Sequence, residues 1–155
     1  MDWRYETNVY MNVQLKERSM IKGIAHLAFY VNDMEASLKF YETFGINKVF
    51  SIMNDKNEPW IEYLKVSDGQ FIELFYSKEL FDALPMWKDK YYAHLCLTVD
   101  DIHTIAKLIT DAGYELAVPP NKGSDHNWQC WTYDPDGNAI EFMQIMPDSL
   151  QVLNS

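Results

Sequence analysis

The sequence predicts an α+β protein of two tandem βαβββ modules, which form a curved mixed sheet around a cleft. The first observation is an internal repeat, because the second half of the 155-residue chain reproduces the first at a constant spacing. The matched pairs are His26-Leu27 with His94-Leu95, Asp68-Gly69 with Asp136-Gly137, and Ile72-Glu73 with Ile140-Glu141. The second observation is that each half contains strand-like apolar runs and one segment with helical spacing.

The helix is the best-marked element of the first module. Asp33 is a suitable N-cap, Gly45 is a suitable C-terminal cap, and apolar residues recur at helical spacing between them. The turn at 67–69 has the composition of a hairpin. The predicted strands of this module are 24–31, 48–53, 60–66 and 70–76.

The second module repeats this order of elements. Its helix runs from 101 to 112 and is closed by Gly113, and its last hairpin turns at 134–137. A loop is predicted through Pro119-Pro120 to Asp125. The predicted strands are 93–99, 115–118, 129–133 and 139–145.

The domain boundaries follow the repeat. Residues 1–20 lie outside it and are interpreted as an N-terminal arm, and residues 147–155 as a C-terminal tail. A chain of this length is typical of one compact domain. That domain spans 21–146, with a first module at 21–77, a linker at 78–90 and a second module at 91–146.

Composition restricts the partners. A formal net charge of −10 argues against nucleic acid and against an anionic membrane surface. No apolar run reaches membrane-spanning length. Cys96 and Cys130 are too few for a disulfide framework and are interpreted as free thiols. We therefore expect a cytoplasmic protein that binds a small molecule.

Four residues at matched positions are candidate metal ligands: His26, Glu73, His94 and Glu141. Because side chains alternate along a strand, the apolar neighbours of all four point to the helices, and the four are predicted to face away from them into one cleft. A buried carboxylate is unfavourable unless it is paired, hydrogen-bonded or bound to a metal. Two imidazoles and two carboxylates suit a divalent ion such as Ni²⁺, Co²⁺, Zn²⁺, Mn²⁺ or Fe²⁺. In the alternative interpretation, these four residues bind no metal and are polar residues with a structural role that the repeat has duplicated.

Several motifs are similar to those of a known superfamily. They are 24–29, Phe71-Ile72-Glu73-Leu74, His94-Leu95 and, most specifically, Asp134-Pro135-Asp136-Gly137-Asn138-Ala139-Ile140-Glu141. On these motifs, residues 21–146 resemble the vicinal oxygen chelate superfamily, which includes glyoxalase I, extradiol dioxygenases and bleomycin-resistance proteins. The resemblance implies paired βαβββ modules with a metal on the concave face, and a homodimer in which modules pair within or between chains.

The ligand order His, Glu, His, Glu is similar to that of bacterial glyoxalase I, a lactoylglutathione lyase. The resemblance implies a metal-dependent lyase or isomerase that acts through a metal-bound enediolate on an α-oxo or thiohemiacetal small molecule. By position, Glu141 is the catalytic base and Glu73 its symmetry mate. Tyr30 and Ser77 stand where such enzymes often have an Arg and an Asn, and that Arg helps to hold glutathione. The substrate, possibly a thiol adduct, therefore stays open.

Two other functions of the superfamily stay open as alternatives. An extradiol-type Fe²⁺ dioxygenase would use three protein ligands, and the fourth carboxylate argues against it. A metal-free protein that sequesters a drug, of the bleomycin-resistance kind, usually lacks some of the four metal ligands. The four intact residues here therefore argue against it.

The cleft wall is predicted to be aromatic, which suits an apolar or planar part of a substrate. A hairpin register that places Cys130 opposite Glu141, and Glu62 opposite Glu73, brings further side chains to the site. His126 lies in a loop that can close over a cleft. The predicted substrate-binding residues are Tyr30, Trp60, Phe71, Trp128, Cys130 and His126.

Overall fold

The structure, a computed structural model, describes residues 23–79 and 92–155. The predicted arm at 1–20 and nearly all of the predicted linker lie outside the described residues. Within the described parts of the chain, no helix is long and apolar enough to cross a membrane.

The first module has the predicted order of elements. They are β1 (His26–Val31), α2 (Met34–Thr43), β2 (Lys48–Met53), β3 (Pro59–Ser67) and β4 (Gln70–Tyr76). Its four strands form one mixed sheet in the order β1-β4-β3-β2, in which β1 runs parallel to β4 and the other pairs are antiparallel.

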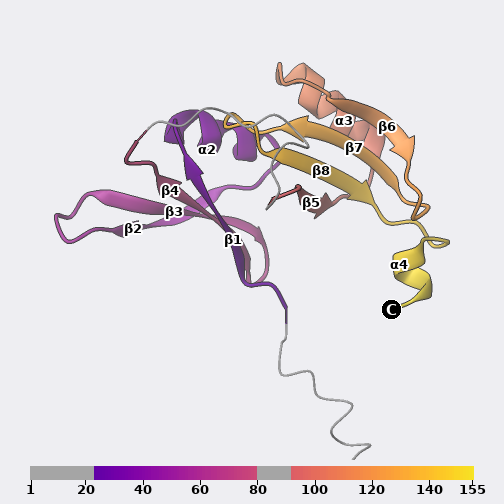
Figure 1. Cartoon of the computed structure of the whole chain (residues 1–155), viewed down its shortest axis with the longest axis horizontal. Helices are drawn as coiled ribbons and strands as arrows, with labels where there is room; N and C mark the ends of the chain where they lie inside the picture. The colour runs from indigo at the N-terminus through magenta and orange to yellow at the C-terminus, as the bar shows by residue number, and fades with distance from the viewer. Residues whose placement is uncertain (1–22, 80–91) are drawn as a thin grey trace, which may run out of the picture.

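The second module repeats the same topology (Figure 1). Its elements are β5 (Leu95–Thr98), α3 (Ile102–Asp111), β6 (Val118–Lys122), β7 (Trp128–Tyr133) and β8 (Ala139–Gln144). The strand order is β5-β8-β7-β6, with β5 parallel to β8, and α3 lies against β6, β7 and β8. A short helix, α4 (Leu150–Leu153), occupies the predicted tail. Two βαβββ modules in two mixed sheets confirm the predicted fold class.

The helix ends are set by the predicted residues. The side chain of Asp33 accepts a hydrogen bond from the Ala36 amide, and that of Asp101 accepts one from the His103 amide. These contacts satisfy N–H groups that have no partner inside a helix. Gly45 and Gly113 follow the helices at φ of +76° and +83°, a backbone region that a side chain disfavours.

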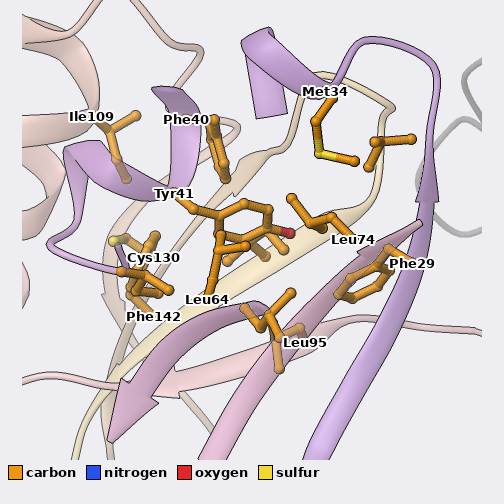
Figure 2. Packing of buried hydrophobic residues seen from close by; sticks show 14 of the residues in the cluster. Phe29, Met34, Phe40, Tyr41, Leu64, Leu74, Leu95, Ile109, Cys130 and Phe142 are labelled. Atoms are coloured by element: carbon orange, nitrogen blue, oxygen red, sulfur yellow. The ribbon is translucent and has the colours of Figure 1, made fainter. Parts of the chain in front are cut away.

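One hydrophobic core joins the two modules (Figure 2). The side chains of α2 lie between the two sheets, so that Phe40 packs edge-on against Tyr114, and Phe44 packs against Phe142 at a ring separation of 4.8 Å. Each large apolar side chain buried here contributes about 1.5–3 kcal/mol. The core includes Phe29, Leu64 and Leu74 from the first sheet and Leu95, Cys130 and Phe142 from the second.

The strand predicted at 115–118 is wrong in position, since β6 begins at Val118 and includes both prolines. Proline lacks an N–H donor and is tolerated in a sheet at an edge or a bulge. The strand β6 is an edge of its sheet, and its pairing with β7 shifts register between Val118 and Asn121. Both conditions for proline are met there.

Candidate metal centre

The first sheet carries a His–Glu pair. Ala28 of β1 is the register partner of Glu73 in β4, and His26 lies two residues before Ala28 on the same face. The His26 Nδ1 atom is 3.3 Å from Glu73 Oε1. Glu73 is buried, whereas the His26 side chain is 47% exposed. The hydroxyl of Tyr63, the cross-strand neighbour of Glu73, donates a hydrogen bond to its carboxylate, and this bond raises the pKa of Tyr63.

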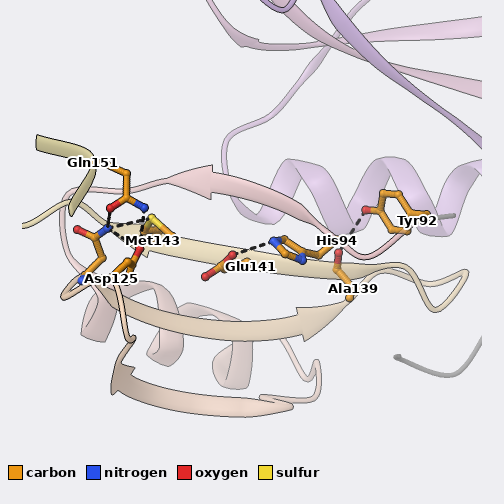
Figure 3. Close-up of polar contacts among 8 residues, drawn as sticks. Tyr92, His94, Asp125, Ala139, Glu141, Met143 and Gln151 are labelled. Atoms are coloured by element: carbon orange, nitrogen blue, oxygen red, sulfur yellow. Dashed lines mark hydrogen bonds and ion pairs between the residues drawn. The ribbon is translucent and has the colours of Figure 1, made fainter. Parts of the chain in front are cut away.

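The second sheet carries the matching pair (Figure 3). His94 lies directly before β5, and its Nε2 atom is 3.1 Å from Oε2 of Glu141 in β8. Cys96 is the register partner of Glu141, and its thiol donates a hydrogen bond to that carboxylate. Trp131 packs edge-on against the His94 ring at 4.7 Å.

Electrostatics around Glu141 reflect its burial. Desolvation raises the pKa of Glu141, and the Cys96 thiol and His94 act in the opposite direction. Desolvation and the Glu141 carboxylate together raise the pKa of the Cys96 thiol to about 12. Cys96 is therefore a protonated hydrogen-bond donor at neutral pH and not a nucleophile.

Both pairs face away from the helices, as the strand alternation predicted. We call these surfaces the site faces, and the opposite surfaces, which build the shared core, the core faces. Because both core faces pack into one core, the two site faces point away from each other. Among residues 23–79 and 92–155, no group of three or more His, Cys, Asp or Glu side chains is arranged to hold a metal ion. One chain thus brings the four predicted ligands together as two pairs and not as one cluster.

The donor chemistry of the pairs fits a divalent ion. Together they offer two imidazole nitrogens and two carboxylates, a set that borderline divalent metals accept. The Nδ1 atom of His94 is buried and is without a hydrogen-bond partner in the structure. A buried polar atom without a partner is unfavourable and calls for an explanation. A ring that reorients toward a ligand on this face is one such explanation.

Phe71 and Tyr30 share the face of the first pair, whereas Trp60, like its repeat equivalent Trp128, lies on the alternate face of its strand. Phe71 is the register partner of His26, and its ring packs edge-on against Tyr63. Tyr30 and Trp60 both pack against the ring of Phe75. Their contact with a substrate stays a prediction.

Two predicted substrate residues belong to the core face. The predicted hairpin register is wrong by one residue, because Trp131 and not Cys130 lies opposite Glu141. The closing pair of the hairpin is Asp134 with Asn138, which leaves a three-residue loop and shifts the strands by one position. Cys130 is consequently buried in the core, and Trp128, on the same face of β7, packs beside His103 of α3.

The same shift applies in the first module. Tyr63 lies opposite Glu73, and the predicted partner Glu62 lies opposite Leu74 on the core face. The equivalent positions of the two modules therefore carry Tyr63 and Trp131. These two residues and Cys96 adjoin the carboxylates of Glu73 and Glu141 and were missed, although a correct hairpin register identifies the first two from sequence.

His126 is held by its own loop. Its backbone has a φ of +75°, and its Nδ1 atom is 3.2 Å from the carbonyl oxygen of Asp148. The neighbouring Asn127 and Asp125 bond Gln151, which ties the loop to α4 (Figure 3). The side chain of His126 is thus directed to the segment before α4.

Comparison with known proteins identifies the family. Residues 23–142 match the sequence model of the Glyoxalase/Bleomycin resistance protein/Dioxygenase superfamily. The chain belongs to this superfamily. The match covers both modules and both His–Glu pairs. Among curated proteins, none matches the chain.

Solved structures of the superfamily share the fold at low sequence identity. A superfamily member from Sphaerobacter thermophilus has 24% identity and a TM-score of 0.65, over 82% of this chain and 100% of its own. A glyoxalase family protein from Enterococcus faecalis has 22% identity and a TM-score of 0.67, over 81% and 99%. A glyoxalase I variant from Zea mays has 20% identity and a TM-score of 0.67, over 79% of this chain and 44% of its own. At this identity the likeness concerns the fold alone.

Proposed function

We propose that this protein is a metal-dependent lyase or isomerase of the glyoxalase I type, with each site assembled from two copies of the chain. The observation that carries the proposal is the pair of outward site faces, each with one His and one buried Glu. In a symmetric dimer, the site face of one first sheet can meet that of the partner's second sheet. Two-fold symmetry then creates two equal sites, each with two His and two Glu ligands.

The substrate class that we propose is a small α-oxo compound or hemithioacetal. A divalent ion, when bound, polarises a carbonyl oxygen of the substrate. His26 and His94 would bind the ion through imidazole nitrogens, and the Tyr63 hydroxyl orients the carboxylate of Glu73 by a hydrogen bond. Glu141 removes the proton from the hydroxyl-bearing carbon next to the carbonyl and returns it to the carbonyl carbon, which is general acid–base catalysis by one group. The hydroxyl proton moves to the former carbonyl oxygen, and the hydroxyl-bearing carbon becomes the new carbonyl.

The surroundings of Glu141 support its role as the base. In the described structure its carboxylate is bonded by His94 and by the Cys96 thiol. A thiol is a weak hydrogen-bond donor, so Glu141 retains acceptor capacity for a proton. We also propose a cytoplasmic location, which is supported by Cys96 and Cys130 both being free thiols.

Metal analysis of the purified protein tests this proposal. We expect about one Ni, Co, Zn, Mn or Fe per chain, since a dimer with two sites has one site per chain. His94→Ala and Glu141→Gln should each lower the metal content. His103→Ala, which changes an exposed histidine of α3, should leave it unchanged. A wild-type protein that takes up no metal after reconstitution would contradict the proposal and favour a metal-free binding protein.

Activity with hemithioacetals of methylglyoxal is the second test. Glu141→Gln should reduce turnover by about 10²-fold or more, as removal of a general base usually does. Ring-opening consumption of oxygen with catechols, in place of isomerisation, would instead identify the dioxygenase alternative.

A further inference from the structure

We propose that residues 9–15 form an additional β-strand, which pairs in antiparallel orientation with the free edge of β2 in the same chain. The proposal concerns a surface of the first module and is independent of the metal-binding function. Three observations carry it: the alternating sequence of this segment, the uncovered edge of β2, and the end of the sheet at which Gly23 lies.

The sequence of the segment alternates with a period of two. Val9, Met11, Val13 and Leu15 alternate with Tyr10, Asn12, Gln14 and Lys16. The alternation extends back to Trp3 and Tyr5, which occupy odd-numbered positions like the apolar residues. Strict alternation over this length indicates a strand with one apolar face and one polar face.

A strand of this kind needs a sheet to join. Its backbone N–H and C=O groups require partners, and its apolar face requires cover. The two described sheets end at β1, β2, β5 and β6. Of these edges, β6 contains Pro119 and Pro120, which have no N–H to donate, and β5 has only four residues.

The edge of β2 is the apolar one. Among the described residues β2 pairs with β3 alone, and Figure 1 shows it at the side of the first sheet away from the second module. Val49, Phe50 and Met53 of β2 are 50%, 46% and 43% exposed, and no other described strand exposes three large apolar side chains. An apolar edge with free backbone groups favours pairing with a further strand.

The direction of the chain at Gly23 fits this edge. The strand pairings place the start of β1 and the start of β2 at the same end of the first sheet. A segment whose carboxyl end leads to Gly23 therefore ends where β2 begins. The added strand is consequently antiparallel to β2, as β3 is on the other side.

The length of the connection fits as well. The position beyond β2 is four strand spacings, about 19 Å, from β1. Residues 16–22 span up to about 23 Å when extended, which covers this distance. An open hollow at the same end of the sheet, lined by residues 23–25 and 68–70, gives space for the connection.

The apolar face of the segment matches one face of β2. Phe50 lies on the site face, because its register partner is Tyr63, which lies opposite Glu73. The Phe50 ring stacks on Tyr63 with ring centroids 4.3 Å apart, and its other side is open. The odd-numbered residues of the added strand lie on this face and cover the Phe50 ring as cross-strand neighbours.

Hydrogen–deuterium exchange of the full-length protein tests the pairing. In a bare edge strand, about half of the amides bond the neighbouring strand and the others face water. With the added strand, nearly all amides of 48–53 and alternate amides of 9–15 should exchange at least about tenfold more slowly than in an unstructured peptide, because they exchange only after local opening. Fast exchange throughout 9–15 would overturn the proposal.

Substitutions on the two strands test the contact from both sides. Val13→Asp places a charge on the apolar face and should abolish the additional slow exchange in 48–53, whereas Gln14→Asp, with the same charge on the polar face, should not. Phe50→Asp should abolish slow exchange in 9–15, whereas Leu153→Asp, at an exposed leucine of α4, should not. Unchanged exchange in β4 shows that the sheet stays folded. Full protection of 48–53 that persists in Val13→Asp would contradict the proposal, because another segment would then cover the edge.

Two further outcomes would assign the segment to a different partner. Slow exchange of 9–15 beside a β2 that exchanges as a bare edge would place the strand on another edge, such as β1, and overturn the proposal. Protection that disappears when the protein is diluted to monomers would assign the segment to a second copy and likewise overturn it. These measurements do not require bound metal, so their outcome is independent of the proposed function.

Discussion

Tyr63 and Trp131 occupy equivalent positions of the two modules, each directly across the sheet from a carboxylate of a His–Glu pair. Their chemistry differs, so the two carboxylates differ as well. Glu73 accepts a hydrogen bond from the phenol of Tyr63, whereas Glu141 accepts one from the thiol of Cys96. In the proposed function, the stronger donor would restrain Glu73 as a metal ligand, and the weaker one would leave Glu141 available as the base.

Tyr63→Phe tests the restraint on Glu73. Loss of the hydroxyl removes the hydrogen bond that orients the carboxylate, and loss of such an outer contact typically weakens metal binding by about 10–100-fold. Competition with a metal chelator measures the change. Tyr30→Phe is the control, because the Tyr30 ring packs on Phe75 and the hydroxyl bonds none of the described residues. An unaltered affinity in Tyr63→Phe would show that the phenol does not orient Glu73.

Glu62 is a buried carboxylate that the site does not use. It accepts hydrogen bonds from Ser51 at 2.6 Å and Tyr76 at 2.9 Å, and it pairs with Lys48 at 2.8 Å. Burial acts to raise the pKa of Glu62, but these three partners hold it below its usual value. A carboxyl with a lowered folded-state pKa stabilises the fold above its unfolded pKa of about 4.3.

That stabilisation should therefore be lost as the pH falls through the lowered pKa. At pH 7 we expect Glu62→Gln to reduce the free energy of unfolding by about 2 kcal/mol, since a charged acceptor is lost. Below pH 4 the difference from wild type should shrink, which urea unfolding at both pH values measures. Glu58→Gln, at an exposed glutamate of the same hairpin, should have little effect. A difference that stays constant with pH would contradict this account of Glu62.

At the level of elements, the turn between β7 and β8 links the second module to the first through side-chain hydrogen bonds. Asp136 accepts hydrogen bonds from the Asn32 amide at 3.0 Å and from the Ser37 hydroxyl at 3.4 Å, at the start of α2. Asp134 accepts one from the hydroxyl of Tyr41, which is fully buried in α2. The turn thus satisfies polar groups of a helix that is about 100 residues away in the chain.

Asp136→Ala should lower the melting temperature by about 5 °C, because the buried Ser37 hydroxyl and the part-buried Asn32 amide lose their acceptor. The repeat supplies a matched control in Asp68, the equivalent residue of the first module. Its side chain is 99% exposed and pairs with Lys65 alone among the described residues, so Asp68→Ala should shift the melting temperature by less than about 1 °C. Equal changes in melting temperature for the two variants would contradict a stabilising contact between Asp136 and the first module.

Local sequence signals predicted most of the elements. Strands β2 and β4 have the predicted bounds, and both helices begin after their predicted caps. These features depend on residues within a few positions of one another. The residues that form β6 are set by the position of this strand at a sheet edge, and the register of each hairpin depends on the conformation of its turn. Neither property is a local one, which explains the errors at Pro119-Pro120 and at Cys130.

At the level of the whole molecule, the fold explains why one chain holds two separate His–Glu pairs. Side chains of α2 fill the space between both core faces, and one core results. The faces that carry the His–Glu pairs consequently point outward in opposite directions. The repeat in the sequence predicted that the four His and Glu side chains face away from the helices, and their role as metal ligands stays a prediction. How the modules pack on each other depends on contacts such as Phe44 with Phe142 and Tyr41 with Asp134, which the repeat does not contain.

The most direct test of the assembled site is complementation between two defective chains. One chain carries His26→Ala with Glu73→Gln, and the other carries His94→Ala with Glu141→Gln. Each variant alone should lack every complete site. A heterodimer isolated through two different affinity tags should have one site with all four ligands and one with none, and hence about half the metal of the wild-type dimer. A heterodimer that binds no more metal than either variant alone would contradict a site built from two chains.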